Sequence, residues 1–169
     1  MPISMYQISV PVFVNGLSAL SHLLQQGEAH ARDQGADPAS LLEARLAPDM
    51  MTLTGQVQRA SDTSKLALER LTGIASPKLE DSEKTFAELF TRIERTKAYI
   101  GSFTETQLEA SEEKQIQLNL GEFKPTFTGP SYLLTFALPN FFFHVTTAHD
   151  ILRHKGVKIG KSDYLRLQG

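Results

Sequence analysis

Apolar residues recur at alternating steps of three and four along four long segments of the chain, which is the spacing of one face of an α-helix. The first apolar stripe consists of Val10, Phe13, Leu17, Leu20 and Leu24. Ser4 and Gln7 form an S-x-x-Q capping pattern, so the first helix is predicted to begin near Ser4. Pro11 is expected either to kink this helix or to mark its true first turn.

The second and third stripes predict two further helices in the middle of the chain. The second stripe consists of Met50, Leu53, Val57, Ala60, Ser64, Ala67 and Leu71. Asp49 is predicted to cap this helix and Gly73 to end it, and its small central residues predict close approach of a neighbouring helix. The third stripe consists of Phe86, Leu89, Ile93 and Ile100. A cap at Asp81 or Ser82 and a stop at Gly101 are expected to bound this third helix.

The period changes between residues 114 and 127, where apolar and polar side chains alternate on both sides of Gly121-Glu122. This alternation predicts a two-stranded hairpin. After Gly129-Pro130 a fourth helical stripe consists of Leu134, Leu138, Phe141, Val145, Ala148 and Leu152. The stripe crosses Pro139, where a bend is expected, and Gly156 ends it. The whole chain, residues 1–169, is therefore predicted to be a single all-α domain: an antiparallel four-helix bundle with a small β-hairpin before its last helix.

Composition excludes several classes of function. A net charge of −2 and a pI near 6.2 give no basic surface for a nucleic acid, and no apolar run is long enough to span a membrane. The chain has no cysteine, so disulfides and thiolate ligands are excluded. The residues after Met1 show no secretory signal pattern. A cytoplasmic protein is the expectation.

The residues 139–164 contain the strongest candidates for a chemical site, because three of the chain's five histidines lie there. His144 and His149 flank the apolar stripe on opposite sides, and His144 lies nearer the expected bend at Pro139. On the second helix, Gln56 occupies a boundary position from which its amide can point between the helices. A pocket formed by Gln56, His144 and His149 is therefore the candidate site.

Histidine spacing argues against a simple metal centre. Each of the intervals His144–His149 and His149–His154 is five residues, which corresponds to a rotation of about 140° and a rise of about 7.5 Å on a helix. Neither pair can hold one ion from a regular helix. Asp150 and His154 have the required spacing of four, but they lie roughly opposite the apolar stripe. They are weak metal candidates, and a surface pair is the favoured interpretation.

Three segments carry a resemblance to a known family: PNFFFHVTTAHDILRHKGVKIGKSDYL, QVQRASDTSKLALERLTG and TFAELFTRIERTKAYI. Together they resemble a bacterial family of unknown function within the DinB/YfiT-like superfamily. The resemblance implies a four-helix bundle, often dimeric, that holds a divalent metal through one histidine on the second helix and an H-x-x-x-H pair on the last. Some members resemble thiol-dependent transferases and others hydrolases. This sequence has no histidine on its second helix and lacks the H-x-x-x-H pair, so a degenerate or lost metal site is expected.

Two functional hypotheses remain open at this point. The first is an enzyme-like bundle that binds an unknown small molecule between the second and fourth helices, with His144 as base or ligand and Gln56 orienting the bound group. The second is a non-catalytic binding or dimerisation protein. The run Phe141-Phe142-Phe143 cannot face one core. Phe143 is therefore expected either under the hairpin or tail, or at the contact of a homodimer. The acidic pair Glu80-Asp81 is interpreted as solvated loop charge.

Overall fold

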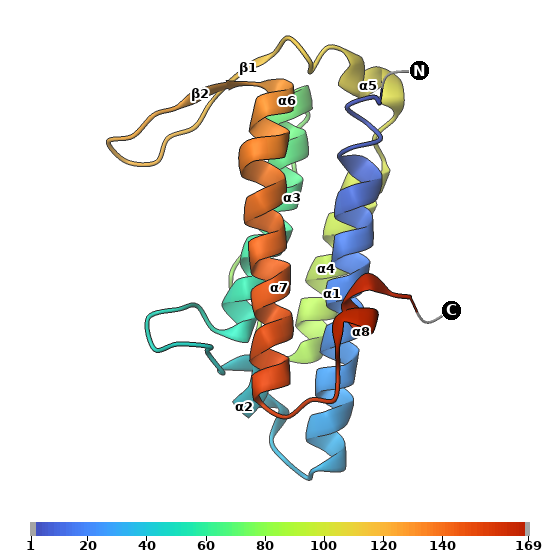
Figure 1. The fold of residues 1–169 in the computed structure, drawn as a ribbon, viewed down its shortest axis with the longest axis vertical. Helices are drawn as coiled ribbons and strands as arrows, with labels where there is room; N and C mark the ends of the chain where they lie inside the picture. The colour runs from blue at the N-terminus through green and yellow to red at the C-terminus, as the bar shows by residue number, and fades with distance from the viewer. Residues whose placement is uncertain (1–2, 168–169) are drawn as a thin grey trace.

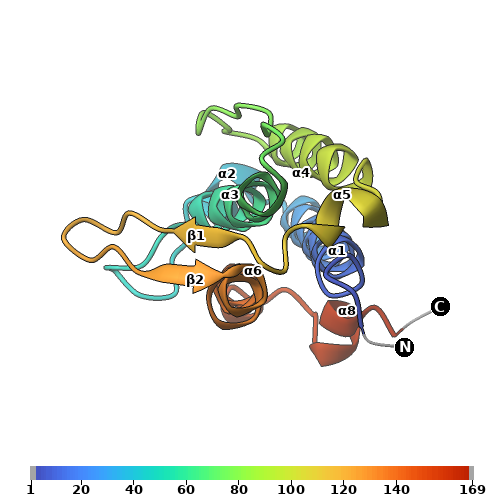
Figure 2. The same cartoon turned by 90° about the horizontal axis from the view of Figure 1, so that it is seen from above.

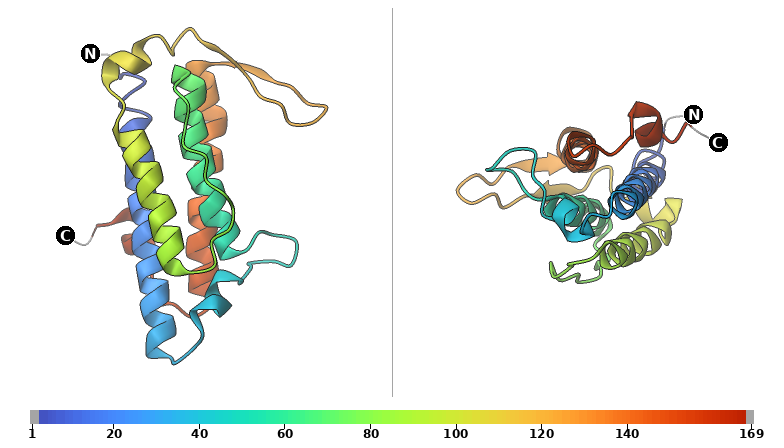
Figure 3. Two further views of the ribbon diagram at one scale, coloured as in Figure 1. Left: turned by 180° about the vertical axis from the view of Figure 1, so that it is seen from behind. Right: turned by 90° about the horizontal axis from the view of Figure 1, so that it is seen from below.

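The computed structural model describes residues 3–167, and its four long helices lie side by side (Figure 1). These are α1 (Val10–Asp33), α3 (Leu53–Thr72), α4 (Phe86–Gly101) and α7 (Leu138–His154). Viewed along their length from above and from below, they surround one core (Figures 2 and 3). The shorter elements are α2 (Pro38–Leu42), α5 (Glu105–Glu109), β1 (Gln115–Gln117), β2 (Thr126–Thr128), α6 (Gly129–Tyr132), the π-helix η1 (Leu133–Ala137) and α8 (Lys161–Leu165). Within residues 3–167, no helix is long and apolar enough to cross a membrane.

The core is built from the predicted apolar stripes of all four long helices. Its fully buried side chains include Phe13, Leu17, Leu53, Val57, Leu89, Ile93, Phe141 and Leu152. Ala60, Ser64 and Ala67 on α3 are also buried, and α3 makes its most extensive helix contact with α7. The small residues in the middle of α3 therefore do face a closely packed neighbour.

The starts of three helices differ from their predicted positions. Ser4 and Gln7 make their reciprocal hydrogen bonds, but they close only a turn, and α1 begins at Val10 with Pro11 in its first turn. The N-cap of α3 is Thr52, whose hydroxyl accepts the Gly55 N–H at 3.1 Å, so the prediction of Asp49 is wrong.

The cap of α4 was also placed too early by the sequence pattern. Thr85 and Glu88 form a reciprocal capping box there, in place of Asp81 or Ser82. Asp81 and Ser82 lie before the start of α4, within a long connection.

Residues 73–85 form this long connection between α3 and α4, and they run back along the full length of α3 (Figure 3). Ser76 hydrogen-bonds Glu69 near the end of α3, whereas Glu83 accepts a bond from Gln58 near its start. Because the chain returns before α4 begins, α3 and α4 run in the same direction. The connection between α3 and α4 is therefore a full-length crossover and not the short loop that joins antiparallel neighbours.

The segment before α7 contains a π-helical turn that changes which residues are buried. Leu133 and Ala137 are fully buried, whereas Leu134 is 52% exposed. A π-turn holds one more residue than an α-turn, so it shifts the register of the apolar face. The prediction that Leu134 belongs to the core is therefore wrong. The disturbance expected at Pro139 takes the form of this wider turn directly before it.

The hairpin pairs β1 with β2 in antiparallel register, with Ile116 opposite Phe127. Both strands are shorter than the alternating pattern suggests, because only an isolated bridge between Leu120 and Phe123 continues the pairing. Figure 1 shows the hairpin projecting sideways from one end of the four long helices.

Gly129, at the junction of β2 and α6, is predicted to tolerate no side chain. A Cβ at this position would lie 1.9 Å from the backbone carbonyl oxygen of Ser111. We expect Gly129→Ala to lower the free energy of unfolding by about 1–3 kcal/mol, as overpacked sites do. Urea denaturation measures the change. The matched control is Gly101→Ala in α4, where no atom lies within 4 Å of the new Cβ; it should leave stability unchanged or raise it. Equal effects of the two substitutions would contradict the packing at Gly129.

Candidate functional site

The structure brings His144 of α7 against Gln56 of α3. His144 Nδ1 lies 2.8 Å from Gln56 Oε1, and this hydrogen bond joins residues that are 88 positions apart in the chain. Gln56 is 2% exposed, whereas His144 is half-buried. Two of the three residues of the predicted pocket therefore meet between α3 and α7.

The hydrogen bonds of Gln56 define which nitrogen of His144 carries a proton. Gln56 Nε2 donates to the backbone carbonyl of Met51 at 3.3 Å. The other end of the amide, its carbonyl oxygen, must then face His144, because a flipped amide would point oxygen at oxygen. An oxygen accepts, so His144 Nδ1 carries the hydrogen and donates it. In the neutral ring, Nε2 is left with a free lone pair.

The surroundings of His144 favour its neutral form. Burial lowers the pKa of the imidazole below its ordinary value of 6.5, and the nearby charge of Arg59 lowers that pKa further. His144 Nε2 is also not among the buried side-chain atoms that lack a partner in the described part of the chain. With no protein partner in residues 3–167, this nitrogen must keep contact with solvent. His144 therefore offers an accessible acceptor near neutral pH.

Other polar side chains continue this contact along the two helices. Asn140 lies one turn before His144 on α7, and its Nδ2 donates to Thr63 Oγ1 at 3.0 Å. Arg59 lies one turn after Gln56 on α3 and pairs with Asp62 at 2.9 Å. We call these five residues the α3–α7 polar strip: Gln56, Arg59, Thr63, Asn140 and His144.

His149, the third predicted pocket residue, lies on a different face of α7. Its ring packs edge-on against Tyr164 of α8, with centroids 6.2 Å apart. Its Nδ1 hydrogen-bonds the adjacent Asp150 at 2.8 Å, and its Nε2 is buried without a partner in the described residues. The structure therefore separates His149 from Gln56 and His144 and gives it a place under the C-terminal segment.

The two weak metal candidates do not converge. The hydrogen bond of Asp150 goes to His149, and the side chain of His154 is exposed near the end of α7. Within residues 3–167, no group of three or more His, Cys, Asp or Glu side chains gathers as a metal centre would require. At the polar strip His144 contributes an imidazole, but Gln56 and Asn140 contribute amides, which are poor ligands for transition metals. This donor set does not fit a three-ligand transition-metal ion.

A buried arginine, Arg92, is the feature that the sequence analysis missed. Its guanidinium, 1% exposed, lies 2.9 Å from Asp62, 2.8 Å from Glu83 and 3.1 Å from Asp81. Asp81 also pairs with Arg59. Asp81 is 45% exposed on the loop, in line with its interpretation as solvated charge, but it also helps to fasten the crossover to α3 and α4. The available signal was the position of Arg92 inside an apolar stripe, directly before Ile93.

Comparisons with known proteins add a family and a fold. Residues 5–165 match the family described as a domain of unknown function, DUF1993. Among solved structures, the chain is similar to a DinB family member protein from Shewanella denitrificans, with 39% sequence identity and a TM-score of 0.90. This similarity covers 95% of the present chain and 91% of the other. A search of curated proteins found no match.

Proposed function

Because the chain belongs to the DUF1993 family, a DinB-like family, we propose that it binds a small molecule at the α3–α7 polar strip through the neutral imidazole of His144. The supporting observation is the hydrogen bond of 2.8 Å between His144 Nδ1 and Gln56 Oε1. It ties together the two helices on which, by the superfamily resemblance, a metal site is expected. In this chain the groups that meet between these helices are the amide of Gln56 and the imidazole of His144.

The chemistry we propose for this contact is hydrogen-bond acceptance and proton transfer by His144. Gln56 holds the ring with Nδ1 protonated, so Nε2 can accept a hydrogen bond, or a proton, from a hydroxyl or thiol group of a bound molecule. Burial and the charge of Arg59 lower the pKa of His144, which keeps this acceptor unprotonated at neutral pH. The proposal needs no metal, in keeping with the amide donors around His144.

We also infer that α1, α3, α4 and α7 form a four-helix bundle in which α3 and α7 are antiparallel neighbours. Figure 1 shows α1 and α7 running opposite to α3 and α4. In chain order, two parallel helices, α3 and α4, lie between α1 and α7, which run the other way, so the bundle has one long crossover connection, residues 73–85. It places His144, on the descending α7, beside Gln56 in the first turn of the ascending α3.

The binding proposal is tested with protein-observed NMR and a panel of small alcohols and thiols. We expect some of these compounds to shift the side-chain amide signals of Gln56 in the native protein, and His144→Ala to abolish those shifts. His149→Ala is the matched control, because it removes a histidine from the other face of α7. Purified protein should carry no stoichiometric zinc, nickel or iron. Such a metal, if it disappeared in His144→Ala, would overturn the metal-free proposal; ligand shifts that persist in His144→Ala would exclude His144 as the binding group.

The alternative function is a non-catalytic protein that pairs with a second copy. The observation in its favour is Phe143, which is 55% exposed. If this surface forms a homodimer, Phe143→Ser should shift the protein from dimer to monomer in sedimentation velocity. Phe123→Ser, which changes an exposed phenylalanine at the hairpin, is the control. A monomeric native protein at all concentrations tested would rule out this alternative.

A further inference from the structure

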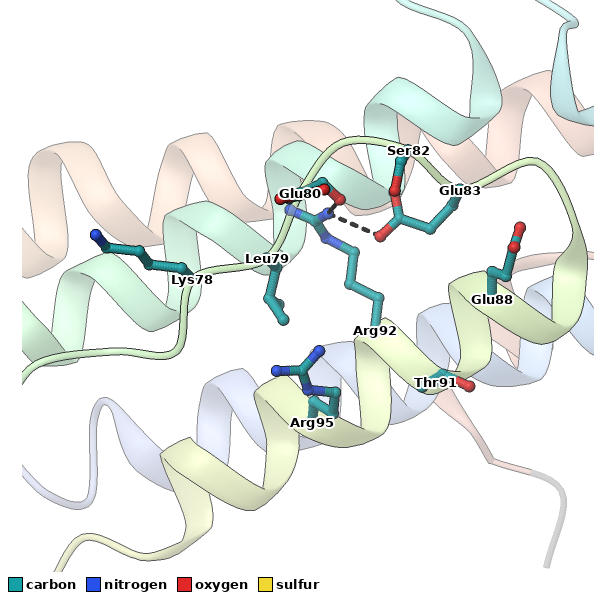
Figure 4. A pocket seen from close by; sticks show the side chains of 9 residues that line it. All are labelled: Lys78, Leu79, Glu80, Ser82, Glu83, Glu88, Thr91, Arg92 and Arg95. Atoms are coloured by element: carbon teal, nitrogen blue, oxygen red, sulfur yellow. Dashed lines mark hydrogen bonds and ion pairs between the residues drawn. The ribbon is translucent and has the colours of Figure 1, made fainter.

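A cavity separate from the polar strip lies between α4 and the crossover. It has a volume of about 430 Å³, and neither Gln56 nor His144 contributes to its wall. Its charged lining consists of Lys78, Glu80, Glu83, Glu88, Arg92 and Arg95 (Figure 4). We call it the α4 pocket. Its volume lies within the range typical of small-molecule sites.

The charges of the α4 pocket are balanced but not all paired. Glu83 is bound to Arg92 at 2.8 Å. In the described part of the chain, neither Lys78 nor Arg95 forms an ion pair, and Glu88 uses its carboxylate to accept the backbone N–H of Lys84 and Thr85. Two cations, Lys78 and Arg95, and two carboxylates, Glu80 and Glu88, therefore remain on the wall without an ion-pair partner among residues 3–167.

These unpaired charges are separated along the pocket. Figure 4 shows Lys78 and Arg95 toward one end, Glu88 toward the other, and Glu80 between them beside Arg92. Glu88 and Arg95 are two helical turns apart on α4, so their backbones are separated by about 10.5 Å along the axis. An anion alone would meet the carboxylates, and a cation alone would meet Arg95. A molecule that carries both charges at opposite ends matches the lining.

Arg92 supplies an unused donor between the two charged ends. It rises from α4 between Glu88 and Arg95, and its side chain is 1% exposed. Its two terminal nitrogens bind carboxylates and the Glu80 carbonyl, but Nε is buried with no hydrogen-bond partner in the described residues. Buried donors in proteins are almost always paired. An acceptor such as a carbonyl on a bound molecule would complete this guanidinium.

We propose that the α4 pocket binds a short peptide of about three residues, with its terminal carboxylate at Arg95 and its terminal ammonium toward Glu88. An extended chain spans about 3.3–3.6 Å per residue, so a tripeptide matches the axial separation of the Glu88 and Arg95 backbones on α4. Its termini are both charged near neutral pH. In this proposal a carbonyl in its middle is the acceptor for Arg92 Nε, which is buried without a partner among residues 3–167.

The test is isothermal titration of the full chain with triglycine at low ionic strength. We expect saturable binding by the native protein, weakened by about tenfold or more in Arg95→Glu and also weakened in Glu88→Gln, which keeps the helix cap but removes the charge. Lys124→Glu makes the same charge change in the hairpin and should bind triglycine normally. Circular dichroism establishes that each variant is folded, and Arg95→Gln replaces Arg95→Glu if the latter is not.

Two blocked peptides separate a zwitterion site from a simple ion site. N-acetyltriglycine lacks the ammonium and triglycine amide lacks the carboxylate, so each should bind about tenfold more weakly than triglycine, or worse. Equal binding of N-acetyltriglycine would show an anion site and overturn the proposal. So would the absence of saturable triglycine binding at millimolar concentrations, or unchanged binding in folded Arg95→Glu and Arg95→Gln.

Discussion

Arg92→Ala should lower the free energy of unfolding by about 3–5 kcal/mol, the usual cost of removing one partner from a buried ion pair. The side chain of Arg92 is 1% exposed and binds Asp62 and Glu83 at 2.9 and 2.8 Å. Without it, Glu83, which is itself largely buried, loses its cation, and the crossover loses its main attachment to α4. Chemical denaturation at neutral pH measures the loss.

Arg95→Ala provides the comparison, because it removes an exposed arginine one turn further along the same helix. We expect it to change stability by less than about 0.5 kcal/mol. Losses of similar size in both variants would mean that a general effect of removing an arginine from α4, and not the buried ion pairs, explains the effect of Arg92→Ala.

The pH dependence of the Arg92 effect follows from Glu83. Burial acts to raise the pKa of Glu83, but hydrogen bonds from Arg92 and Gln58 outweigh it and hold that pKa below 4.5. Stability from this pairing is therefore present above pH 4.5 and is lost as the pH falls through the depressed pKa. The difference in stability between the native protein and Arg92→Ala should shrink over that acidic range.

Gln56→Glu should raise the pKa of His144 above its ordinary value, because an opposite charge within hydrogen-bond distance favours the imidazolium. In the native protein, burial and Arg59 lower the pKa of His144, so its contribution to stability is present above pH 6.5 and is lost as the pH falls below that value. In the Gln56→Glu protein the sign reverses: the stabilising pair forms below pH 6.5 and is lost as the pH rises through the raised pKa.

The reversal is measured by comparing denaturation of the two proteins between acidic and mildly alkaline pH. Gln26→Glu adds the same charge at an exposed position on α1 and should leave the pKa of His144 unchanged. If the Gln56→Glu protein retains the native pH profile, Gln56 and His144 are not in contact.

The core could be predicted from the sequence because the spacing of apolar residues along each helix shows which face of that helix is buried. The stripes through Phe13, Leu53, Ile93 and Phe141 all face the core in the structure. Periodicity does not report the direction of a helix or the path between helices. The parallel course of α3 and α4 follows from the crossover, whose polar attachments, such as Asp81 to Arg92, have no periodic signature.

The candidate site was predictable only in part for a similar reason. Gln56 and His144 could be named because each lies at the edge of its apolar stripe, and the structure joins them by a hydrogen bond. His149 lies at the other edge of its stripe, so the same reasoning could not separate it from His144. Which edge faces α3 depends on helix order in space. Leu134 was misplaced because nothing in the residue pattern indicates the π-helical turn.

The protonation state of the His144 ring tests the account most directly. A long-range ¹H–¹⁵N correlation spectrum, recorded through a pH titration of the native protein, distinguishes the two neutral tautomers and gives the pKa. We predict a ring protonated at Nδ1, with a free Nε2 and a pKa below 6.5. A ring protonated at Nε2, or a pKa at or above 6.5, would contradict the proposal that Gln56 holds His144 as an accessible acceptor.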